Sequence, residues 1–365
     1  MVSFLKQRIM GIALVVVLAL QAVLAYSSFA PSLQMKVKEL PVGLVNLDQG
    51  KDIKEGNSQN VGKMLQDMVT TNPVEQVKWT RYTSQEEASQ AMDRKEIYAA
   101  LILPSDLTAR IGSADTDNPV RAEAELLVNE GMNVTGAKSA ETIVRDIISK
   151  MNDQLQEQTL SAFKLKEIKI SPDQANGMNK MIHIKQTVVH GVGSNMGLGQ
   201  FPGMMTILIW MGSLIGAVFI WIVTRKMKGS KAFFPASILS GLILAALQSI
   251  WIVVIVNGFL NLEVAYVWNI MLYIVFNAAV FFFLQIAVLY WTGMKGFFVL
   301  ALIWLFGGPL VSIPPEFLSA IYRDWMYSWL PIRFSTEGFR NILFFNNGAD
   351  LSRMILMSSL IGLGS

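Results

Sequence analysis

Residues 204–223 read MMTILIWMGSLIGAVFIWIV, a run without a charged side chain. The hydrocarbon core of a bilayer is about 30 Å thick and is crossed by about 20 apolar residues of helix, so this stretch predicts a membrane span. Similar runs occur before and after it. The full spans that we expect are residues 9–30, 204–223, 233–260, 268–291 and 297–313, the last interrupted by Gly307, Gly308 and Pro309.

The two ends of the chain carry shorter or more ambiguous apolar runs. Lys6 and Arg8 precede the first run, as in a secretory signal peptide, but the run is long for a signal and favours a retained helix within residues 1–30. A sixth run begins near Met354 and is too short to cross before the last residue. The predicted fold is therefore an α-helical transmembrane bundle of five full spans plus a partial sixth, with its main block at residues 201–365.

The charges of the short loops predict the orientation, because cytoplasmic loops carry an excess of Lys and Arg. Residues 31–200 hold 19 basic against 22 acidic side chains, so we expect them outside the cytoplasm. The net charge of +3 is then a consequence of topology, and no nucleic-acid partner is indicated. The segments expected inside carry seven basic residues and no acidic one: Lys6, Arg8, Arg225, Lys226, Lys228, Lys231 and Lys295.

Polar groups inside the spans are few and uncharged. No Asp, Glu, Lys, Arg or His lies within the second to fifth spans, which argues against a proton- or ion-coupled transporter. Gly212 and Gly216 form a small-xxx-small pair that lets a neighbouring helix approach closely. Four amides have two alternative roles, hydrogen bonding between helices or lining a substrate path: Gln248, Asn257, Asn277 and Gln285.

Residues 31–200 alternate strand and helix patterns, which predicts an inserted extracytoplasmic α/β (or α+β) domain. Ser84 and Glu87 form a capping box at the start of one helix. The apolar face of a long helix over residues 134–160 packs on the sheet or, as the alternative, forms a dimer seam. Residues 171–201 are rich in Gly, Asn, Ser and Gln and predict a connection to the membrane. Strands are expected at residues 41–48, 77–82, 98–104 and 122–128, and other helices at 61–69, 84–92 and from 105.

Catalytic and cofactor motifs are missing from the sequence. The chain has no cysteine and two histidines, His183 and His190, so it offers neither a thiolate nor a histidine cluster for a metal. Residues 131–139 approach a phosphate-binding loop, but Ala137 separates the glycine from the lysine. No acid/base pair stands out by spacing. We therefore expect no cofactor and no enzymatic activity in this chain.

The layout of one span, an external domain and a block of spans resembles the permeases of type-2 ABC exporters, especially the YhgE/Pip (phage infection protein) branch. The likeness extends in order over nearly the whole chain. The stretches that carry it are Leu40-Pro-Val-Gly-Leu-Val-Asn-Leu-Asp48-Gln-Gly50, Glu87-Ala-x-x-Ala91 with Tyr98-Ala-Ala-Leu-Ile-Leu-Pro104, Gly197-Leu-Gly199 with Trp210-Met-Gly212, and Trp329-Leu-Pro331 with Gly338-Phe-Arg340, the last resembling an external turn before the final span.

The resemblance implies a multi-pass permease subunit in a bacterial cell membrane. Such a subunit pairs with itself or a paralogous permease, works with a separate ABC ATPase subunit, and moves an amphipathic or hydrophobic cargo. The candidate coupling loop is Arg225, Lys226, Lys228 and Lys231. The alternative hypothesis is a membrane-anchored surface receptor or secretion accessory protein that transports nothing.

Overall fold

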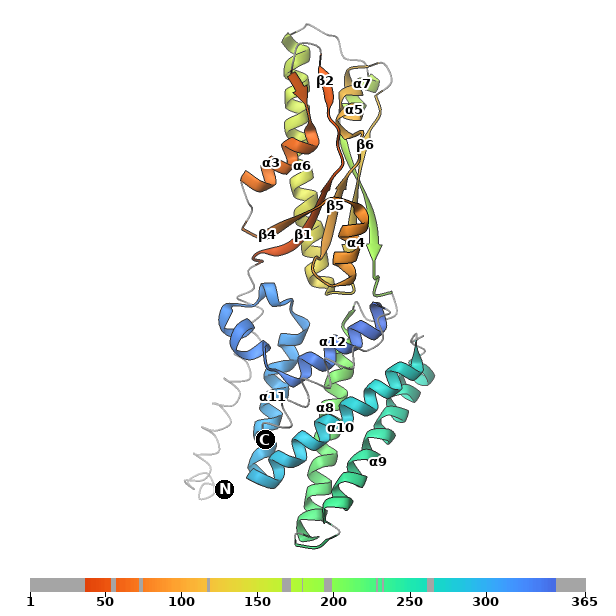
Figure 1. Cartoon of the computed structure of the whole chain (residues 1–365), viewed down its shortest axis with the longest axis vertical. Helices are drawn as coiled ribbons and strands as arrows, with labels where there is room; N and C mark the ends of the chain where they lie inside the picture. The colour runs from red at the N-terminus through yellow and green to blue at the C-terminus, as the bar shows by residue number, and fades with distance from the viewer. Residues whose placement is uncertain are drawn as a thin grey trace, which may run out of the picture. The chain divides into compact units, whose positions relative to one another are not determined.

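The structure, a computed structural model, falls into two compact units, Val37–Val192 and a helical unit that begins at Gly193 (Figure 1). Each is described separately. The structure describes residues 37–53, 57–71, 75–116, 119–165, 172–178, 180–193, 199–227, 229–231, 233–260 and 266–345. The first span expected within residues 1–30 and the partial span expected from Met354 lie outside these residues.

The first unit is built on a five-stranded mixed sheet in the order β4-β1-β5-β6-β7. β1 (Leu40–Asn46) lies between β4 (Val77–Tyr82) and β5 (Ala99–Leu103) and is parallel to both. β6 (Ala122–Asn129) runs antiparallel to β5 and parallel to β7 (Ile182–Val189). A short hairpin of β2 (Lys51–Ile53) and β3 (Asn57–Gln59) stands apart. Strands and helices alternate along the chain, as the sequence predicts.

Helices cover both faces of this sheet. On one face, α4 (Gln85–Asp93) packs Ala88, Ala91 and Met92 on Ile102 and its neighbours. On the other, α6 (Val134–Leu165) crosses the strands, and its Arg145 donates a hydrogen bond of 2.6 Å to Gln186 of β7. The apolar stripe predicted for this helix is buried against the sheet, so a dimer seam is not needed to cover these side chains. All of β5 is buried because both faces are covered.

Local sequence signals explain the ends of the shorter helices. The Ser84 side chain accepts from the Glu87 N–H at 3.2 Å and caps α4, while Glu87 accepts from the Thr83 N–H at 2.8 Å, so the predicted capping box is confirmed with its return bond one residue earlier. Asp48 fixes the start of α3 (Val61–Thr71) by accepting from the Gly62 N–H at 2.9 Å. Helix α5 (Leu107–Ile111) follows β5 and continues as η1 (Gly112–Asp115).

The segment predicted as a simple connection is structured, so that prediction is wrong. Residues 172–178 form α7 (Pro172–Met178), and Ile182–Val189 form β7, the edge strand beside β6. The strand reads IHIKQTVV, and the Gly, Asn and Ser residues that made the segment resemble a connection lie before and after it. Asn152 of α6 binds both backbone groups of Ile182, donating at 3.0 Å and accepting at 2.8 Å.

The second unit contains four helices that are long and apolar enough to cross a membrane, among the residues that the structure describes. They are α8 (Phe201–Thr224) with the short η3 (Arg225–Met227), α9 (Phe233–Val253) with the π-helical turn η4 (Val254–Phe259), α10 (Val267–Thr292) and α11 (Lys295–Ser312). Their bounds agree with the second to fifth predicted spans within a few residues.

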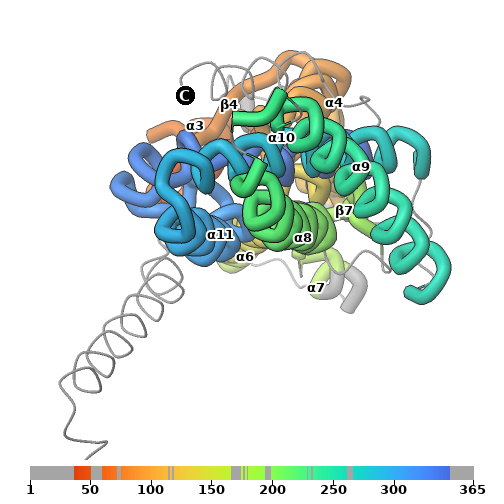
Figure 2. The backbone as a smooth tube through the Cα atoms, turned by 90° about the horizontal axis from the view of Figure 1, so that it is seen from below, coloured from red at the N-terminus to blue at the C-terminus, as the bar shows by residue number. Residues whose placement is uncertain are grey.

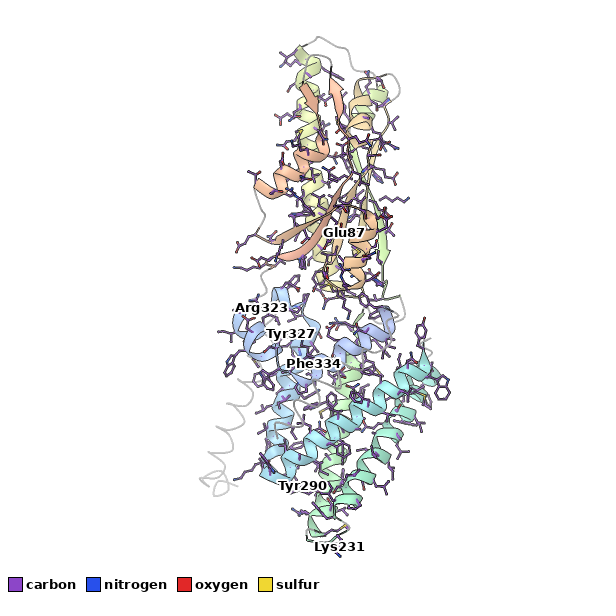
Figure 3. The ribbon with its side chains drawn as sticks, in the orientation of Figure 1. Glu87, Lys231, Tyr290, Arg323, Tyr327 and Phe334 are labelled. Atoms are coloured by element: carbon purple, nitrogen blue, oxygen red, sulfur yellow. The ribbon has the colours of Figure 1, made fainter. Side chains whose placement is uncertain are left out.

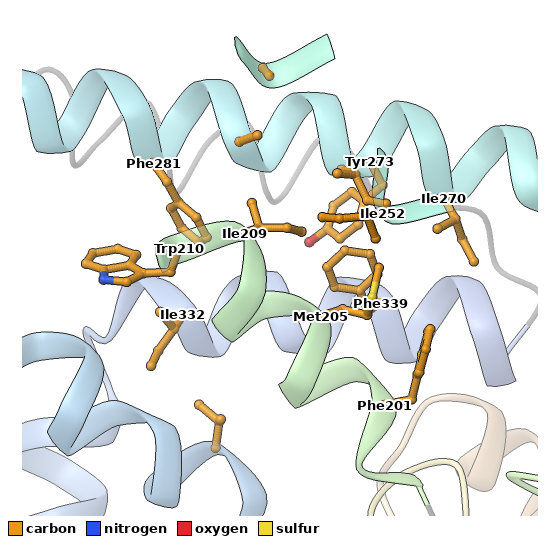
Figure 4. Close-up of a cluster of buried hydrophobic side chains, with 14 of the residues drawn as sticks. Phe201, Met205, Ile209, Trp210, Ile252, Ile270, Tyr273, Phe281, Ile332 and Phe339 are labelled. Atoms are coloured by element: carbon orange, nitrogen blue, oxygen red, sulfur yellow. The ribbon is translucent and has the colours of Figure 1, made fainter. Parts of the chain in front are cut away.

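Helix α8 lies at the centre of this unit and contacts α9, α10, α11 and α12 (Pro331–Phe344) (Figure 2). Its buried side chains Met205, Ile209 and Trp210 face Tyr273 and Phe281 of α10, and Phe281 meets the Trp210 ring edge-on at 4.9 Å (Figure 4). The outer faces of α9 and α11 expose large apolar side chains, among them Leu247, Trp251 and Phe298. Such a surface suits contact with lipid or with further helices.

Two local predictions in this unit are wrong. Helix α11 is not interrupted at Gly307–Pro309 and continues to Ser312 with Pro309 inside it. Gly307 instead allows a close approach, because an added Cβ would collide with Ile332 and Leu330. The stretch that resembled an external turn, Trp329–Pro331 with Gly338–Arg340, lies mostly in α12, which has Pro331 at its first position, where a proline costs no hydrogen bond. Two shorter helical segments, η5 (Pro315–Phe317) and η6 (Ile321–Tyr327), precede it.

Candidate functional site

The centre of α8 is narrow, and this permits close contact with α9. A Cβ on Gly212 would lie 2.7 Å from Gln248 Oε1, and one on Gly216 would overlap the Leu244 side chain. Both neighbours belong to α9. The close approach predicted from the small-xxx-small pair is therefore confirmed, and it places the amide of Gln248 directly against the backbone of α8.

Gln248 belongs to a chain of hydrogen bonds across three helices. Its Nε2 donates to Ser213 Oγ of α8 at 3.4 Å, and Ser213 Oγ donates to the Ala278 carbonyl of α10 at 3.2 Å. Ser213 is fully buried. One face of α8 thus links α9 and α10 through side-chain polar groups rather than through apolar packing alone.

Gln285 approaches the same part of α8 from α10. It is fully buried, and its Nε2 donates to the Trp210 carbonyl at 3.1 Å. Gln248 and Gln285 therefore meet α8 within the segment from Trp210 to Ser213, and we call these two amides with Ser213 the amide layer. Two of the four predicted amides are brought together here.

The other two predicted amides lie elsewhere. Asn277 is buried and donates to the Tyr273 carbonyl of its own helix at 2.8 Å, so it does not bridge helices. Asn257 lies in the π-helical turn η4. In the described part of the helical unit, three amide oxygens are buried without a hydrogen-bond partner: Gln248 Oε1, Asn257 Oδ1 and Gln285 Oε1. Buried polar atoms are seldom left so, and each can accept from water or from a polar group of a ligand.

A second polar cluster links α8, α10 and α12, and the sequence analysis missed it. Thr206 Oγ1 donates to Ser335 Oγ at 3.1 Å, Thr336 Oγ1 donates to Thr206 Oγ1 at 3.2 Å, and the Tyr273 hydroxyl donates to the Ser335 carbonyl at 3.1 Å. Each of these side chains is almost fully buried. The amphipathic helical spacing after Pro331 could have indicated this cluster. The family resemblance predicted a turn there instead.

An ion pair with a buried arginine on α12 also escaped the sequence analysis. Arg340 is only 7 % exposed, pairs with Glu337 at 2.6 Å and donates to the Val311 carbonyl of α11 at 3.3 Å. A buried guanidinium is tolerated only when it is paired and hydrogen-bonded, as here. The motif Gly338-Phe-Arg340 therefore joins α12 to the end of α11.

The predicted coupling loop lies at the turn between α8 and α9. Arg225, Lys226 and Lys231 are exposed, and the Arg225 guanidinium stacks 4.6 Å from the centre of the Trp221 ring. Lys228 lies outside the described residues. The described part of this loop holds no acidic residue, so it presents a positive surface.

A hydroxyl cluster ties this loop to a third helix. The Tyr290 hydroxyl of α10 is hydrogen-bonded to Thr224 Oγ1 of α8 and lies 3.1 Å from Ser237 Oγ of α9. Tyr290 lies near the end of the unit that carries Lys231, as Figure 3 shows. Phe233, the first residue of α9, stacks edge-on against Tyr290 at 5.0 Å. The end of α8 and the start of α9 flank the predicted coupling loop, which we call the basic loop, and both contact α10. We call Thr224, Ser237 and Tyr290 the hydroxyl clamp.

A mixed-sheet α/β domain followed by a unit of long apolar helices defines a multi-pass membrane protein. The chain matches the family model described as ABC-2 family transporter protein over residues 6–364 and belongs to that family. Permeases of this family typically lack ATPase activity and work with ABC ATPase partners. No group of three or more side chains able to hold a metal occurs among the described residues.

A solved structure is also similar to part of the chain. It is described as a domain of a putative ABC type-2 transporter from Thermotoga maritima, with 17 % sequence identity and a TM-score of 0.29. The match covers 40 % of this chain and 84 % of that one. A comparison with curated proteins found no match.

Proposed function

We propose that this protein is the permease subunit of an ABC exporter and moves an amphipathic or hydrophobic cargo out of a bacterial cell. Residues 201–365 form the permease domain, residues 31–200 lie outside the cytoplasm, and the basic loop faces the ATP side. The subunit pairs with another copy of itself or with a paralogous permease. The order of the motifs quoted above supports its place in the YhgE/Pip branch.

The observation that carries this proposal is the basic loop together with its hydroxyl clamp. A positive, exposed surface at the α8–α9 turn suits an acidic or polar face of an ATPase, since complementary charge steers and orients protein partners. The clamp connects the same turn to α10, so a displacement of the loop reaches the helix that carries Gln285. Tyr290 of the clamp and Gln285 of the amide layer lie five residues apart on α10, so this helix connects the loop to the amide layer.

The amide layer supports a role in passage of the cargo. A path for an amphipathic molecule needs polar groups that can bind its head group at membrane depth, and polar residues inside membranes commonly have such a function. Gln248 and Gln285 each present an amide oxygen without a partner in the described chain. In the proposed mechanism, movement of α10 relative to α8 exposes these oxygens to the cargo.

Replacing Lys228 and Lys231 by glutamine tests the proposal. The other inside charges, Arg225 and Lys226 included, remain to set topology, so the variant is expected to insert normally. It should lose co-purification with the ATPase and lose export. Lys185→Gln with Lys180→Gln, a pair in the outer unit, is the matched control and should change neither.

The alternative function is a surface receptor or secretion accessory protein that transports nothing. If no ATPase co-purifies with the parent protein, the receptor hypothesis replaces the exporter. If an ATPase co-purifies and export survives in the Lys228/Lys231 variant at the parental rate, the protein is an exporter but this loop is not its coupling element.

A further inference from the structure

The first unit contains a cavity of about 730 Å³ at the edge of its sheet, where β4 meets the end of α3. Its floor is apolar and consists of Leu44, Val69 and Val77, each at most 5 % exposed. Leu44 lies opposite Arg81 in the β1–β4 register, which places the cavity on the face of the sheet that α6 covers. Sites for small organic ligands commonly have volumes of about 300–1,000 Å³, so this cavity has a suitable size.

The rim of the cavity is charged and carries both signs. Glu39, Glu75, Lys78 and Arg81 are all exposed. Two of them are held by neighbours: Glu75 pairs with Lys38 at 3.0 Å, and Arg81 donates to Thr70 Oγ1 at 2.8 Å. An apolar floor below a rim of mixed charge is complementary to a molecule with an apolar chain and a zwitterionic head group.

Trp79 adds a specific polar feature to this wall. It lines the cavity between Val77 and Arg81 on the same strand face, and its Nε1 is buried. This indole N–H has no acceptor within the described part of the chain. Buried indole donors usually find a partner, so the geometry leaves an N–H available to an acceptor on a ligand.

We propose that this cavity binds a single-chain zwitterionic amphiphile, with its chain on Leu44, Val69 and Val77 and an acceptor oxygen on Trp79 Nε1. The charged rim holds the head group. That such a ligand is the exported cargo rests on the proposed function, whereas the binding itself does not. The site lies wholly within the unit Val37–Val192 and needs neither ATP nor the helical unit to be occupied.

Photolabelling of the full chain in lipid nanodiscs tests the site. The probe is a short-chain lysophosphatidylcholine with a diazirine on its acyl chain, and cross-linked residues are mapped by mass spectrometry. We expect cross-links on β1, β4 and the end of α3, saturable by unlabelled probe. Cross-links confined to the membrane helices, or a level in this unit that does not saturate, would overturn the proposal.

Two variants and one control make the result specific. Thr70→Trp fills the rim from α3 and should abolish saturable labelling, whereas Lys63→Trp, an exposed position of the same helix away from the cavity, should leave it unchanged.

Trp79→Phe keeps most of the cavity volume and removes the indole N–H donor, so the affinity for the lysolipid should fall about three- to ten-fold. An alkyl trimethylammonium probe, which has no acceptor, should bind equally to parent and Trp79→Phe protein. Equal labelling by the lysolipid in all three variants would contradict the assignment. The labelling experiment contains no ATPase and does not measure export. Its result therefore does not depend on whether the protein is an exporter.

Discussion

Tyr290 of α10 places its hydroxyl 3.1 Å from Ser237 Oγ of α9, and the same hydroxyl is hydrogen-bonded to Thr224 Oγ1 of α8. Thr224 and Ser237 already donate to carbonyls of their own helices, Ile220 and Phe233. Tyr290 must therefore donate to one of the two hydroxyls. Its single proton makes one of these two hydrogen bonds at a time, and α8 and α9 both contact α10 at this hydroxyl beside the basic loop.

Tyr290→Phe should separate stability from coupling. The partners keep their own helix acceptors, so we expect a loss of about 0.5–1.5 kcal/mol in the free energy of unfolding, the usual net worth of a hydrogen bond. The variant should still co-purify with the ATPase and hydrolyse ATP, while export falls several-fold. Tyr266→Phe, at an exposed tyrosine just before α10, is the control. Unchanged export in Tyr290→Phe would remove the hydroxyl clamp from the mechanism.

Gly212→Ala tests the contact between α8 and α9. The added Cβ would lie 2.7 Å from Gln248 Oε1, and overpacking of this kind costs about 1–3 kcal/mol. Combining it with Gln248→Ala should recover most of that loss, measured as thermal denaturation in detergent. Gly258→Ala, where nothing lies within 4 Å of the new Cβ, is the control. Additive losses in the double variant would mean that the two helices do not meet at this point.

The first unit should fold as a fragment only when it includes β7. Residues 37–192 are expected to unfold cooperatively in urea, and Leu101→Ala in that fragment should cost about 2–5 kcal/mol, since Leu101 is fully buried. Residues 38–165 lack the strand that pairs with all of β6 and lack the backbone partner of Asn152. Two fragments of equal stability would show that β7 contributes nothing to the fold.

The capping box predicts a pH dependence for the same fragment. Hydrogen bonds from the Thr83 backbone and hydroxyl lower the pKa of Glu87 below its ordinary value of 4.5. A lowered folded-state pKa adds stability above the unfolded-state pKa, and that stability is lost as the pH falls through the folded-state value. Glu87→Gln should therefore flatten the acid limb of the unfolding midpoint. Gln90→Glu, an exposed position of α4, should not. Parallel acid limbs for parent and Glu87→Gln would contradict this role.

The sequence predicted the elements whose signal is local. Spans over residues 204–223 and 268–291 follow from composition alone, because a bilayer sets their length. Helix α4 follows from Ser84 and Glu87, and the buried strand β5 from its unbroken apolar run. Gly212 and Gly216 predicted a close helix contact, and the structure supplies Gln248 and Leu244 as the neighbours.

The missed elements depend on contacts far apart in the chain. The strand β7 is polar on one side and is defined by its pairing with β6, some 60 residues earlier. Helix α12 contains Ser335, Thr336 and Gly338, which are weak helix formers, and its buried face is explained only by Thr206 and Val311 of other helices. For the same reason the sequence indicated the four amides but could not show that only Gln248 and Gln285 meet on α8.

The position of the basic loop relative to the membrane tests the account most directly. The chain has no cysteine, so Glu86→Cys and Ser230→Cys each introduce a single thiol at an exposed position, Glu86 being preferred to Ser84 because Ser84 caps α4. Intact cells are treated with an impermeant maleimide, and the same cells after permeabilisation give the total labelling. We predict that the Glu86→Cys variant reacts in intact cells and that the Ser230→Cys variant reacts only after permeabilisation. Reaction of the Ser230→Cys variant in intact cells would place the loop on the outside, where it cannot meet an ATPase, and would contradict the proposed function.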